Sequence, residues 1–422
     1  MTSHRLLPLT IIILILTTTS TTIATNDHQQ TTPLTTSHLI TNVPYVAQTK
    51  KNYCVYADLA MILDHLGLNT TIDELVFYGG VGYSHTYSTA TRLPRENLYA
   101  NLDFTASLFG LTHTTWWTDD TNLTSDQRWD QFYTMLTDNI SHDIPVAAGV
   151  NPFDLPSLQD QYPIHNLTWH LLLPQGRHVI LLIGYNTTNH TVCYQDPNAG
   201  YYGDPSYGDH AWMTDSTLRT ARETSEISFC FTYTPESPPL PKDTAFQLAF
   251  QRNIAVLSGT PPLPGTGLYG INATTRMLHD YTTGASTSHA TILLYKTYGK
   301  TSLDYHLNHF AHQLLTTLYP GRLNVFDIII NGEQNPFDDI ARNKQHTADY
   351  LANSTIQPSL CQNQSRLLRQ EASKWNQLAS SYTQFLKKGL LLSNLKAQLT
   401  ITTMEQLTQD ILSIEEQLVN LA

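Results

Sequence analysis

Apolar residues at helical spacing dominate the first part of the chain that is expected to fold, which begins near residue 43. Residues 54–66 carry a stripe of leucine and isoleucine side chains, and Gly67 follows as a helix stop. Residues 71–77 and 126–140 show a similar amphipathic spacing. The pattern therefore predicts three helices in this part of the sequence.

The pattern changes to that of β-strands after residue 144. Residues 145–150 and 178–185 are nearly continuous apolar runs, which are typical of buried strands. Residues 191–196 alternate between two faces, and residues 227–233 predict a further strand. Helices followed by an antiparallel sheet predict an α+β fold.

A proline-rich segment, residues 235–241 (PESPPLP), interrupts these patterns and predicts a stiff linker between two domains. Beyond it, apolar residues recur at helical spacing, most clearly over residues 361–419. We therefore expect an α+β domain over residues 43–234 and a mainly α-helical domain over residues 242–422.

Residues 1–24 predict a targeting segment. Arg5 precedes an apolar run over residues 6–16, and a small, polar stretch ends at Ala24. Both a cleaved signal peptide and an uncleaved N-terminal membrane anchor fit this pattern, and either one implies export. Residues 25–42 are mostly polar and predict a flexible lead-in. Asn-x-Ser/Thr sequons also fit an exported glycoprotein, and they begin at Asn69, Asn122, Asn139, Asn166, Asn186, Asn189, Asn272, Asn353 and Asn363.

The amino-acid composition argues against some classes of function. Charged residues make up only 14% of the chain, against about a quarter in ordinary globular proteins, and the formal net charge is −12. A chain this acidic offers no basic stripe for phosphates, so we expect no nucleic-acid partner. The four cysteines lack Cys-x-x-Cys spacing and do not predict a zinc site. Cys193 and Cys230 lie on predicted strands, either as a disulfide or as two free core residues.

Two further patterns are weak evidence for a cofactor or a metal. Three glycines between residues 265 and 270 have the spacing of a dinucleotide-binding loop, but they follow a proline-rich segment instead of a strand. Three histidines between residues 306 and 312 share one helical stripe, for which an exposed polar face is the simpler interpretation. We therefore expect neither a cofactor nor a metal site.

Cys54, at the predicted start of a helix, is the candidate nucleophile. The free N–H groups and the dipole of a helix start favour a thiolate. His178 opens a buried strand and is the candidate base, while Asp196 ends the next strand and can orient the histidine. Gln48, six residues before the cysteine, is the candidate donor to the oxyanion. Any one of these residues alone is more often a core residue, so the interpretation depends on the ordered set.

Residues 43–66 (VPYVAQTKKNYCVYADLAMILDHL) and 178–198 (HVILLIGYNTTNHTVCYQDPN) surround these candidates. The two segments resemble the nucleophile and the histidine–aspartate segments of papain-fold cysteine peptidases of the bacteriocin-leader-processing type. A closer resemblance, over about residues 43–235, is to the N-terminal domains of the butirosin biosynthesis protein H family. The resemblance implies a papain-like fold and assigns the oxyanion hole to Gln48, the nucleophile to Cys54, the base to His178 and the orienting group to Asp196.

These residues predict a thiol-dependent hydrolase that cleaves an amide, with a peptide bond as the leading candidate. It is expected to be exported, either secreted or anchored to the outer face of the cell membrane. The same acyl-thioester chemistry fits an acyltransferase of the butirosin type, and a non-catalytic, peptide-binding papain-like module is the third alternative. Export favours hydrolysis, because water and peptides are the partners available outside the cell. A transferase would have to exclude water from the site, and residues 78–87 and 153–169 are the candidates for the lid that this requires.

Overall fold

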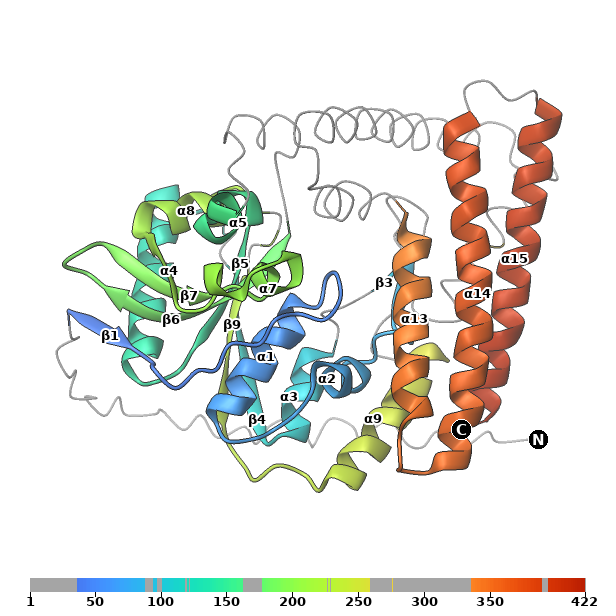
Figure 1. Cartoon of the computed structure of the whole chain (residues 1–422), viewed down its shortest axis with the longest axis horizontal. Coiled ribbons are helices and arrows are strands. Elements are labelled where there is room, and N and C mark those ends of the chain that lie inside the picture. Colours follow the sequence, from blue (N-terminus) through green and yellow to red (C-terminus); the bar gives the residue numbers. More distant parts are fainter. Residues whose placement is uncertain are drawn as a thin grey trace, which may run out of the picture. The chain divides into compact units, whose positions relative to one another are not determined.

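The computed structural model shows an α+β region, residues 36–235, and a helical region, residues 242–421 (Figure 1). The described residues from Thr36 onward belong to one compact unit. The predicted targeting segment and most of the predicted lead-in lie outside the described residues. The structure describes residues 36–87, 94–96, 101–117, 120, 122–161, 177–225, 227, 229–258, 275, 335–388 and 394–421.

A seven-stranded antiparallel sheet forms the centre of the α+β region. Its main path runs in the order β4 (Leu111–Trp117), β9 (Phe229–Pro235), β5 (Val146–Val150), β6 (His178–Asn186), β7 (Thr191–Gln195) and β8 (Ala211–Thr214). The seventh strand, β1 (Ser37–Leu39), pairs with the end of β6 and uses part of the predicted lead-in. β6 is buried from His178 to Tyr185 because other strands flank it on both sides.

Helices α1 (Cys54–His65) and α4 (Ser125–Ser141) pack against this sheet, α1 on β6 and α4 on both β5 and β6. α1 is buried from Cys54 to Leu63 because apolar side chains occupy most of its positions. α4 begins with a capping box, in which the Thr124 hydroxyl accepts from the N–H of Gln127 at 3.2 Å. The remaining elements of this region are α2 (Ile72–Tyr78), β2 (His85–Tyr87), β3 (Pro94–Glu96), α3 (Leu102–Leu108), α5 (Pro156–Gln161), α7 (Pro197–Tyr202) and α8 (Asp215–Glu223).

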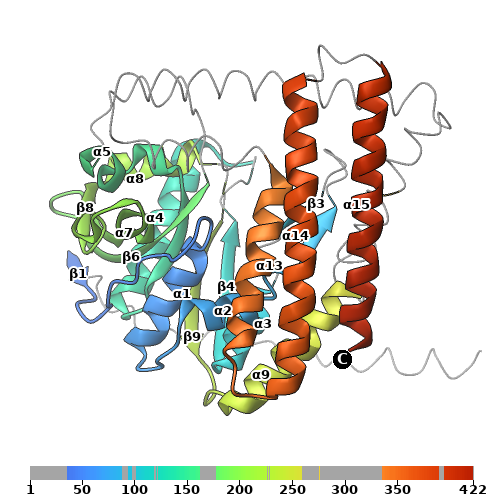
Figure 2. The same ribbon diagram turned by 45° about the vertical axis from the view of Figure 1, so that its right-hand side comes forward.

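Among the described residues, the helical region contains α9 (Lys242–Leu257), α13 (Pro336–Ala352), α14 (Pro358–Lys388) and α15 (Asn394–Asn420). α14 packs against α13 and α15, and the three helices lie side by side (Figure 2). α13 also packs on α2 and β3, and α9 packs on α2, so both helices contact the α+β region. The predicted fold class, an α+β part followed by a mainly helical part, is confirmed. Within the described parts of the chain, no helix combines the length and the apolar character that a bilayer crossing requires.

The aromatic loop that was expected to form one half of a lid is instead part of the core. Tyr78 and Tyr83 are buried, and the turn between them is bound to α13, where the Thr347 hydroxyl donates to the Val81 carbonyl at 2.7 Å. The carbonyl oxygen of Gly82 accepts from Lys344 Nζ at 2.9 Å, and Gly82 has a φ of 87°, which glycine adopts without strain. The lid prediction is therefore wrong for this loop, because its aromatic side chains pack between the two regions. The other half, residues 153–169, is described only as far as residue 161.

The four cysteines are all free and buried. Cys193 lies on β7 and Cys230 on β9, and strands β5 and β6 separate them in the sheet. Three strand spacings amount to about 14 Å, which is about twice the Cα separation that a disulfide spans. The structure therefore excludes a Cys193–Cys230 disulfide, and both residues are free core residues.

Candidate active site

Cys54 is the first residue of α1 and is only 3% exposed. A tight turn precedes it, in which the Tyr53 N–H donates to the Lys50 carbonyl at 3.4 Å. Asn52 has a φ of 66° in this turn, a left-handed conformation that asparagine tolerates better than most residues. Tyr53 makes no side-chain capping hydrogen bond, so the dipole and the N–H groups of the helix start remain available to an anion.

Strands β6 and β7 bring the candidate histidine and aspartate together. His178 is the first residue of β6, and Asp196 directly follows the last residue of β7. Leu181 pairs with Gln195, so Asp196 falls level with a position two residues from His178 and shares its face of the sheet. The His178 Nε2 and Asp196 Oδ1 atoms are 2.7 Å apart, and both side chains are buried. The two sequence segments are therefore adjacent in space through strand pairing.

Three further donors hold Asp196. Ser157 Oγ donates to Oδ2 at 2.5 Å, the Asn198 N–H donates to Oδ1 at 2.9 Å, and the Tyr45 hydroxyl donates to the main-chain carbonyl at 2.8 Å. Burial alone would raise the pKa of the Asp196 carboxyl, but the charge of His178 and the side-chain hydrogen bonds lower that pKa below its usual value. Asp196 is therefore an ionised carboxylate with a fixed orientation.

Cys54 is close enough to the His178 ring to contribute to its pKa. Burial favours the neutral ring, but the charge and the hydrogen bond of Asp196, with help from Cys54, raise the pKa of His178 to about 10. The ring is therefore an imidazolium at neutral pH, with its Nε2–H directed at Asp196. An imidazolium that close to a thiol stabilises the thiolate form.

Asn198 occupies the other side of the ring, with 3.1 Å between its Nδ2 atom and His178 Nδ1. A neutral ring accepts a hydrogen bond at Nδ1, whereas an imidazolium donates one there. The Asn198 amide must therefore present its oxygen to the protonated ring and its nitrogen to the neutral ring. Rotation of the Asn198 amide by 180° would allow it to hydrogen-bond the His178 ring in either protonation state.

Gln48 lies in the segment before α1 and is 4% exposed. Its main-chain N–H donates to the Pro197 carbonyl at 3.1 Å, which joins this segment to the turn that follows Asp196. The Gln48 Oε1 atom has no hydrogen-bond partner among the described residues. An amide oxygen accepts hydrogen bonds, so the group of Gln48 that could serve an oxyanion hole is its Nε2–H donor.

A fourth titratable group, Asp58, lies one helical turn after Cys54 on the same face of α1 and is fully buried. Neither of its carboxyl oxygens has a hydrogen-bond partner among the described residues. Burial and the nearby Cys54 raise the pKa of Asp58 well above its usual value, His178 opposes this, and Asp196 adds to it. Asp58 is therefore a neutral acid beside the thiol.

The sequence analysis assigns no chemical role to Ser157, Asn198 or Asp58. An acidic residue inside an apolar helical run, one turn after a candidate nucleophile, is a signal that could have identified Asp58. Asn198 is visible in the sequence only as part of a turn. Ser157 comes from α5, far from Asp196 along the chain, and no local pattern marks it.

The described residues contain no group of three or more His, Cys, Asp or Glu side chains that could hold a metal ion. The glycines between residues 265 and 270 and the histidines between residues 306 and 312 lie outside the described residues. The groups that the structure does bring together are a thiol, an imidazolium and two carboxyls.

A buried helix that begins with a cysteine and packs on an antiparallel sheet is the arrangement of a papain-like peptidase fold. Residues 40–212 match the model of the Peptidase_C39 like family. The match supports a papain-like cysteine peptidase superfamily for this part of the chain and, in general terms, a hydrolase of the cysteine peptidase type. No curated protein matches the sequence. The matched range ends before α8, β9 and the helical region, and it includes Gln48, Cys54, His178 and Asp196.

Proposed function

We propose that this protein is an exported thiol-dependent hydrolase that cleaves an amide, with a peptide bond as the leading candidate, through an acyl-enzyme on Cys54. The observation that carries the proposal is the buried His178–Asp196 pair, 2.7 Å apart, next to the buried Cys54, whose proximity contributes to the raised pKa of His178. The family match supports the peptidase part of the proposal, because Peptidase_C39 like proteins are a peptidase-type family. The apolar N-terminal run and the sequons support export.

In the proposed reaction, the Cys54 thiolate attacks the amide carbon, a C–S bond forms, and the carbonyl electron pair moves onto the oxygen. The Cys54 N–H and the Gln48 Nε2–H are the proposed donors to that oxyanion. His178 then gives its Nδ1 proton to the leaving nitrogen as the C–N bond breaks, which leaves a thioester. Neutral His178 next takes a proton from water, and the water oxygen attacks the thioester. The C–S bond then breaks, the acid product leaves, and the imidazolium–thiolate pair is restored.

Transfer of the acyl group to an amine is the second candidate, and the enclosure of the site favours it. Cys54 is 3% exposed and His178 is 1% exposed. A site that excludes water protects a thioester until an amine acceptor arrives. The resemblance of this region to the butirosin biosynthesis protein H family also supports this alternative.

An activated ester or thioester of a small acid tests the proposal. Mass spectrometry of the intact protein should show one added acyl group, mapped to Cys54, that disappears in buffer and is unaffected by added amines. The Cys54→Ser variant is the control for acylation elsewhere. An acyl-enzyme that persists in buffer for hours and discharges only when an amine is added would replace hydrolysis with acyl transfer.

A further inference from the structure

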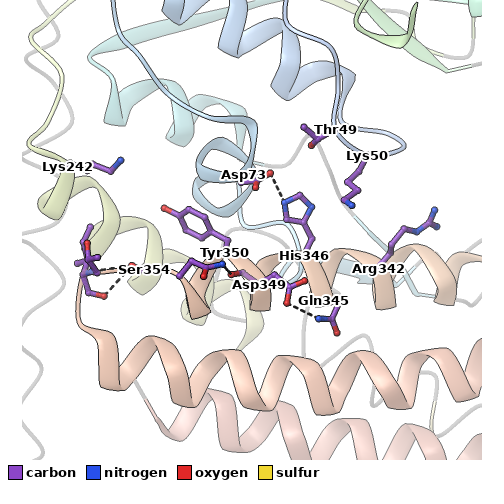
Figure 3. Close-up of a pocket in the computed structure, with 13 residues that line it drawn as sticks. Thr49, Lys50, Asp73, Lys242, Arg342, Gln345, His346, Asp349, Tyr350 and Ser354 are labelled. Atoms are coloured by element: carbon purple, nitrogen blue, oxygen red, sulfur yellow. Dashed lines mark hydrogen bonds and ion pairs between the residues drawn. The ribbon is translucent and has the colours of Figure 1, made fainter. Parts of the chain in front are cut away.

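A pocket of about 590 Å³ opens between the loop that follows Gln48 and the helices α2, α9 and α13 (Figure 3). Its volume falls within the range of small-molecule and peptide-side-chain sites. Thr49 and Lys50 line it from the loop, and Arg342 and His346 line it from α13. The pocket therefore needs residues from both the α+β region and the helical region.

The pocket lies next to the candidate nucleophile. Lys50 and Tyr53 are joined by the tight turn before α1, so their Cα atoms are within about 7 Å of each other. Tyr53 directly precedes Cys54, and its ring centre lies 5.2 Å from that of His346. One further residue adds about 3.8 Å, so Lys50 lies within about 11 Å of Cys54, a distance that three to four extended peptide residues cover.

Cations face this pocket in a chain with a net charge of −12. Lys50 and Arg342 lie at one end, beside the loop, and Lys242 lies at the other end (Figure 3). Within the described part of the chain, Lys50 makes no ion pair, although its charge helps to lower the pKa of Asp73, and Arg342 pairs with Asp339 of its own helix. Lys242 is already paired with Glu74 at 3.2 Å. The end near Cys54 is therefore the one that has positive charge available for a ligand.

The two acidic residues that line the pocket already have partners. Asp73 Oδ1 lies 2.7 Å from His346 Nε2, and this hydrogen bond is the main reason that the pKa of Asp73 is below its usual value. Asp349 pairs with Arg369 at 2.9 Å and accepts from Gln345 Nε2 at 2.9 Å. These partners reduce the repulsion that either carboxylate would exert on an anionic ligand.

We propose that the Lys50–Arg342 end of this pocket binds a carboxylate of the peptide substrate, a few residues from the amide that Cys54 attacks. This inference rests on the proposed function and adds a substrate preference to it. A planar guanidinium and a neighbouring ammonium are suited to a carboxylate. The carboxylate can belong to the C-terminus of a short peptide or to an acidic side chain.

The test is protection of Cys54 from iodoacetamide by acetylated tetrapeptides, using the full chain. Three peptides share one neutral sequence: one ends in a free carboxylate, one is amidated, and one is amidated with glutamate as its last residue. We expect a carboxylate-bearing peptide to protect at a concentration about tenfold lower than the amidated neutral peptide does. Protection by only the free acid identifies the C-terminus, and protection by both acids identifies a general carboxylate site.

The double variant Lys50→Ala/Arg342→Ala should lose this preference, and Lys374→Ala, a lysine of α14 that does not line the pocket, should retain it. Equal protection by the three peptides, protection by none of them, or a preference that survives in the double variant would overturn the proposal. Iodoacetamide reacts without any peptide, so an unreactive Cys54 would contradict the proposed function separately. Calorimetric titration of the same peptides would then test the pocket by itself, with the same expected preference.

Discussion

The α+β region contains one fully buried cluster of ionisable side chains, a second such cluster lies where the helical region meets it, and the two differ in the chemical groups that they hold. The active-site cluster consists of Cys54, Asp58, His178 and Asp196. The lysine cluster lies where the helical region meets β2 and consists of His85, Lys344, Glu371 and Glu415. All eight side chains are at most 3% exposed.

In the lysine cluster, one ammonium group lies beside two carboxyl groups. Lys344 Nζ lies 2.6 Å from Glu371 and 3.5 Å from Glu415, and it also donates to the Gly82 carbonyl. Burial and the charge of Glu371 raise the pKa of Glu415 well above its usual value, against the effect of Lys344. Glu415 therefore keeps its proton, and Glu371 is the close anionic partner of Lys344. His85 Nε2 lies 3.3 Å from Glu415. This cluster joins the two regions, and its chemistry is structural.

The active-site cluster differs from the lysine cluster in that it contains a nucleophile, whereas both clusters contain carboxyl oxygens without a hydrogen-bond partner among the described residues. Asp58 is unpartnered among the described residues, and the Cys54 thiol has the His178 ring as its neighbour. The comparison teaches that burial and perturbed pKa values alone do not identify a catalytic site, because the lysine cluster has both. The distinguishing features are a thiol at a helix start and an oriented imidazolium.

Replacement of His178 should produce the largest change. We expect His178→Ala to lower the alkylation rate of Cys54 at neutral pH by roughly 10²- to 10⁴-fold, because the counter-ion of the thiolate is lost. His190→Ala, at an exposed histidine, is the matched control and should leave the rate unchanged. A rate within threefold of wild type in His178→Ala would show that the imidazolium does not activate the thiol.

Substitutions in the lysine cluster should change the stability of the protein and not the reactivity of Cys54. Glu371→Gln leaves the buried Lys344 without its anion and should lower the free energy of unfolding by about 3–5 kcal/mol. Glu415→Gln replaces a neutral acid with a neutral amide and should cost less than about 1 kcal/mol. Chemical denaturation measures both. Equal losses in the two variants would contradict the assignment of the proton to Glu415.

The His178–Asp196 pair should give the folding stability a defined pH dependence. The pKa of His178 is raised to about 10, so its contribution is complete below the unfolded value of about 6.5 and is lost as the pH rises to about 10. The pKa of Asp196 is lowered, so its contribution is complete above about 4 and is lost as the pH falls further.

The excess stability of wild type over Asp196→Asn should therefore be greatest between about pH 4 and pH 6.5 and should decline on both sides. Unfolding measured across this range, on both proteins, gives the difference directly. A difference that is independent of pH would show that the two side chains do not form an ion pair.

Asp58 should give the smallest change at neutral pH. Because Asp58 holds its proton, Asp58→Asn replaces one neutral group with another and should change the alkylation rate of Cys54 by less than about threefold at pH 7. The two rates should diverge only at alkaline pH, where Asp58 ionises in wild type. A large change at pH 7 would mean that Asp58 is already charged there.

Much of the fold could be predicted because its central helix and strand are formed by continuous apolar stretches of the sequence. The runs at 178–185 and 54–66 correspond to β6 and α1, and both are buried as such patterns require. β4 was not predicted because it is largely exposed, so its side chains lack an apolar alternation. The loop around Tyr83 was misassigned because its burial depends on helices that come about 250 residues later in the sequence.

The part of the site that could be predicted consists of residues at the ends of helices and strands that the sequence pattern reveals. Cys54, His178 and Asp196 lie at the ends of patterned elements, and strand pairing brings two of them together. Residues such as Ser157 act on Asp196 through contacts between elements that are distant in sequence. No periodicity or turn signal encodes such contacts, so they require the structure.

Site-resolved alkylation of the four cysteines tests the central claim most directly. Burial raises the pKa of Cys193 to about 12 and also raises those of Cys230 and Cys361, so these thiols should stay neutral and slow. In the native protein at pH 7, a limiting amount of iodoacetamide followed by peptide mapping should modify Cys54 first, at least about tenfold faster than the other three. Modification of Cys361 at the same rate as Cys54, or faster, would contradict the assignment of Cys54 as the activated nucleophile.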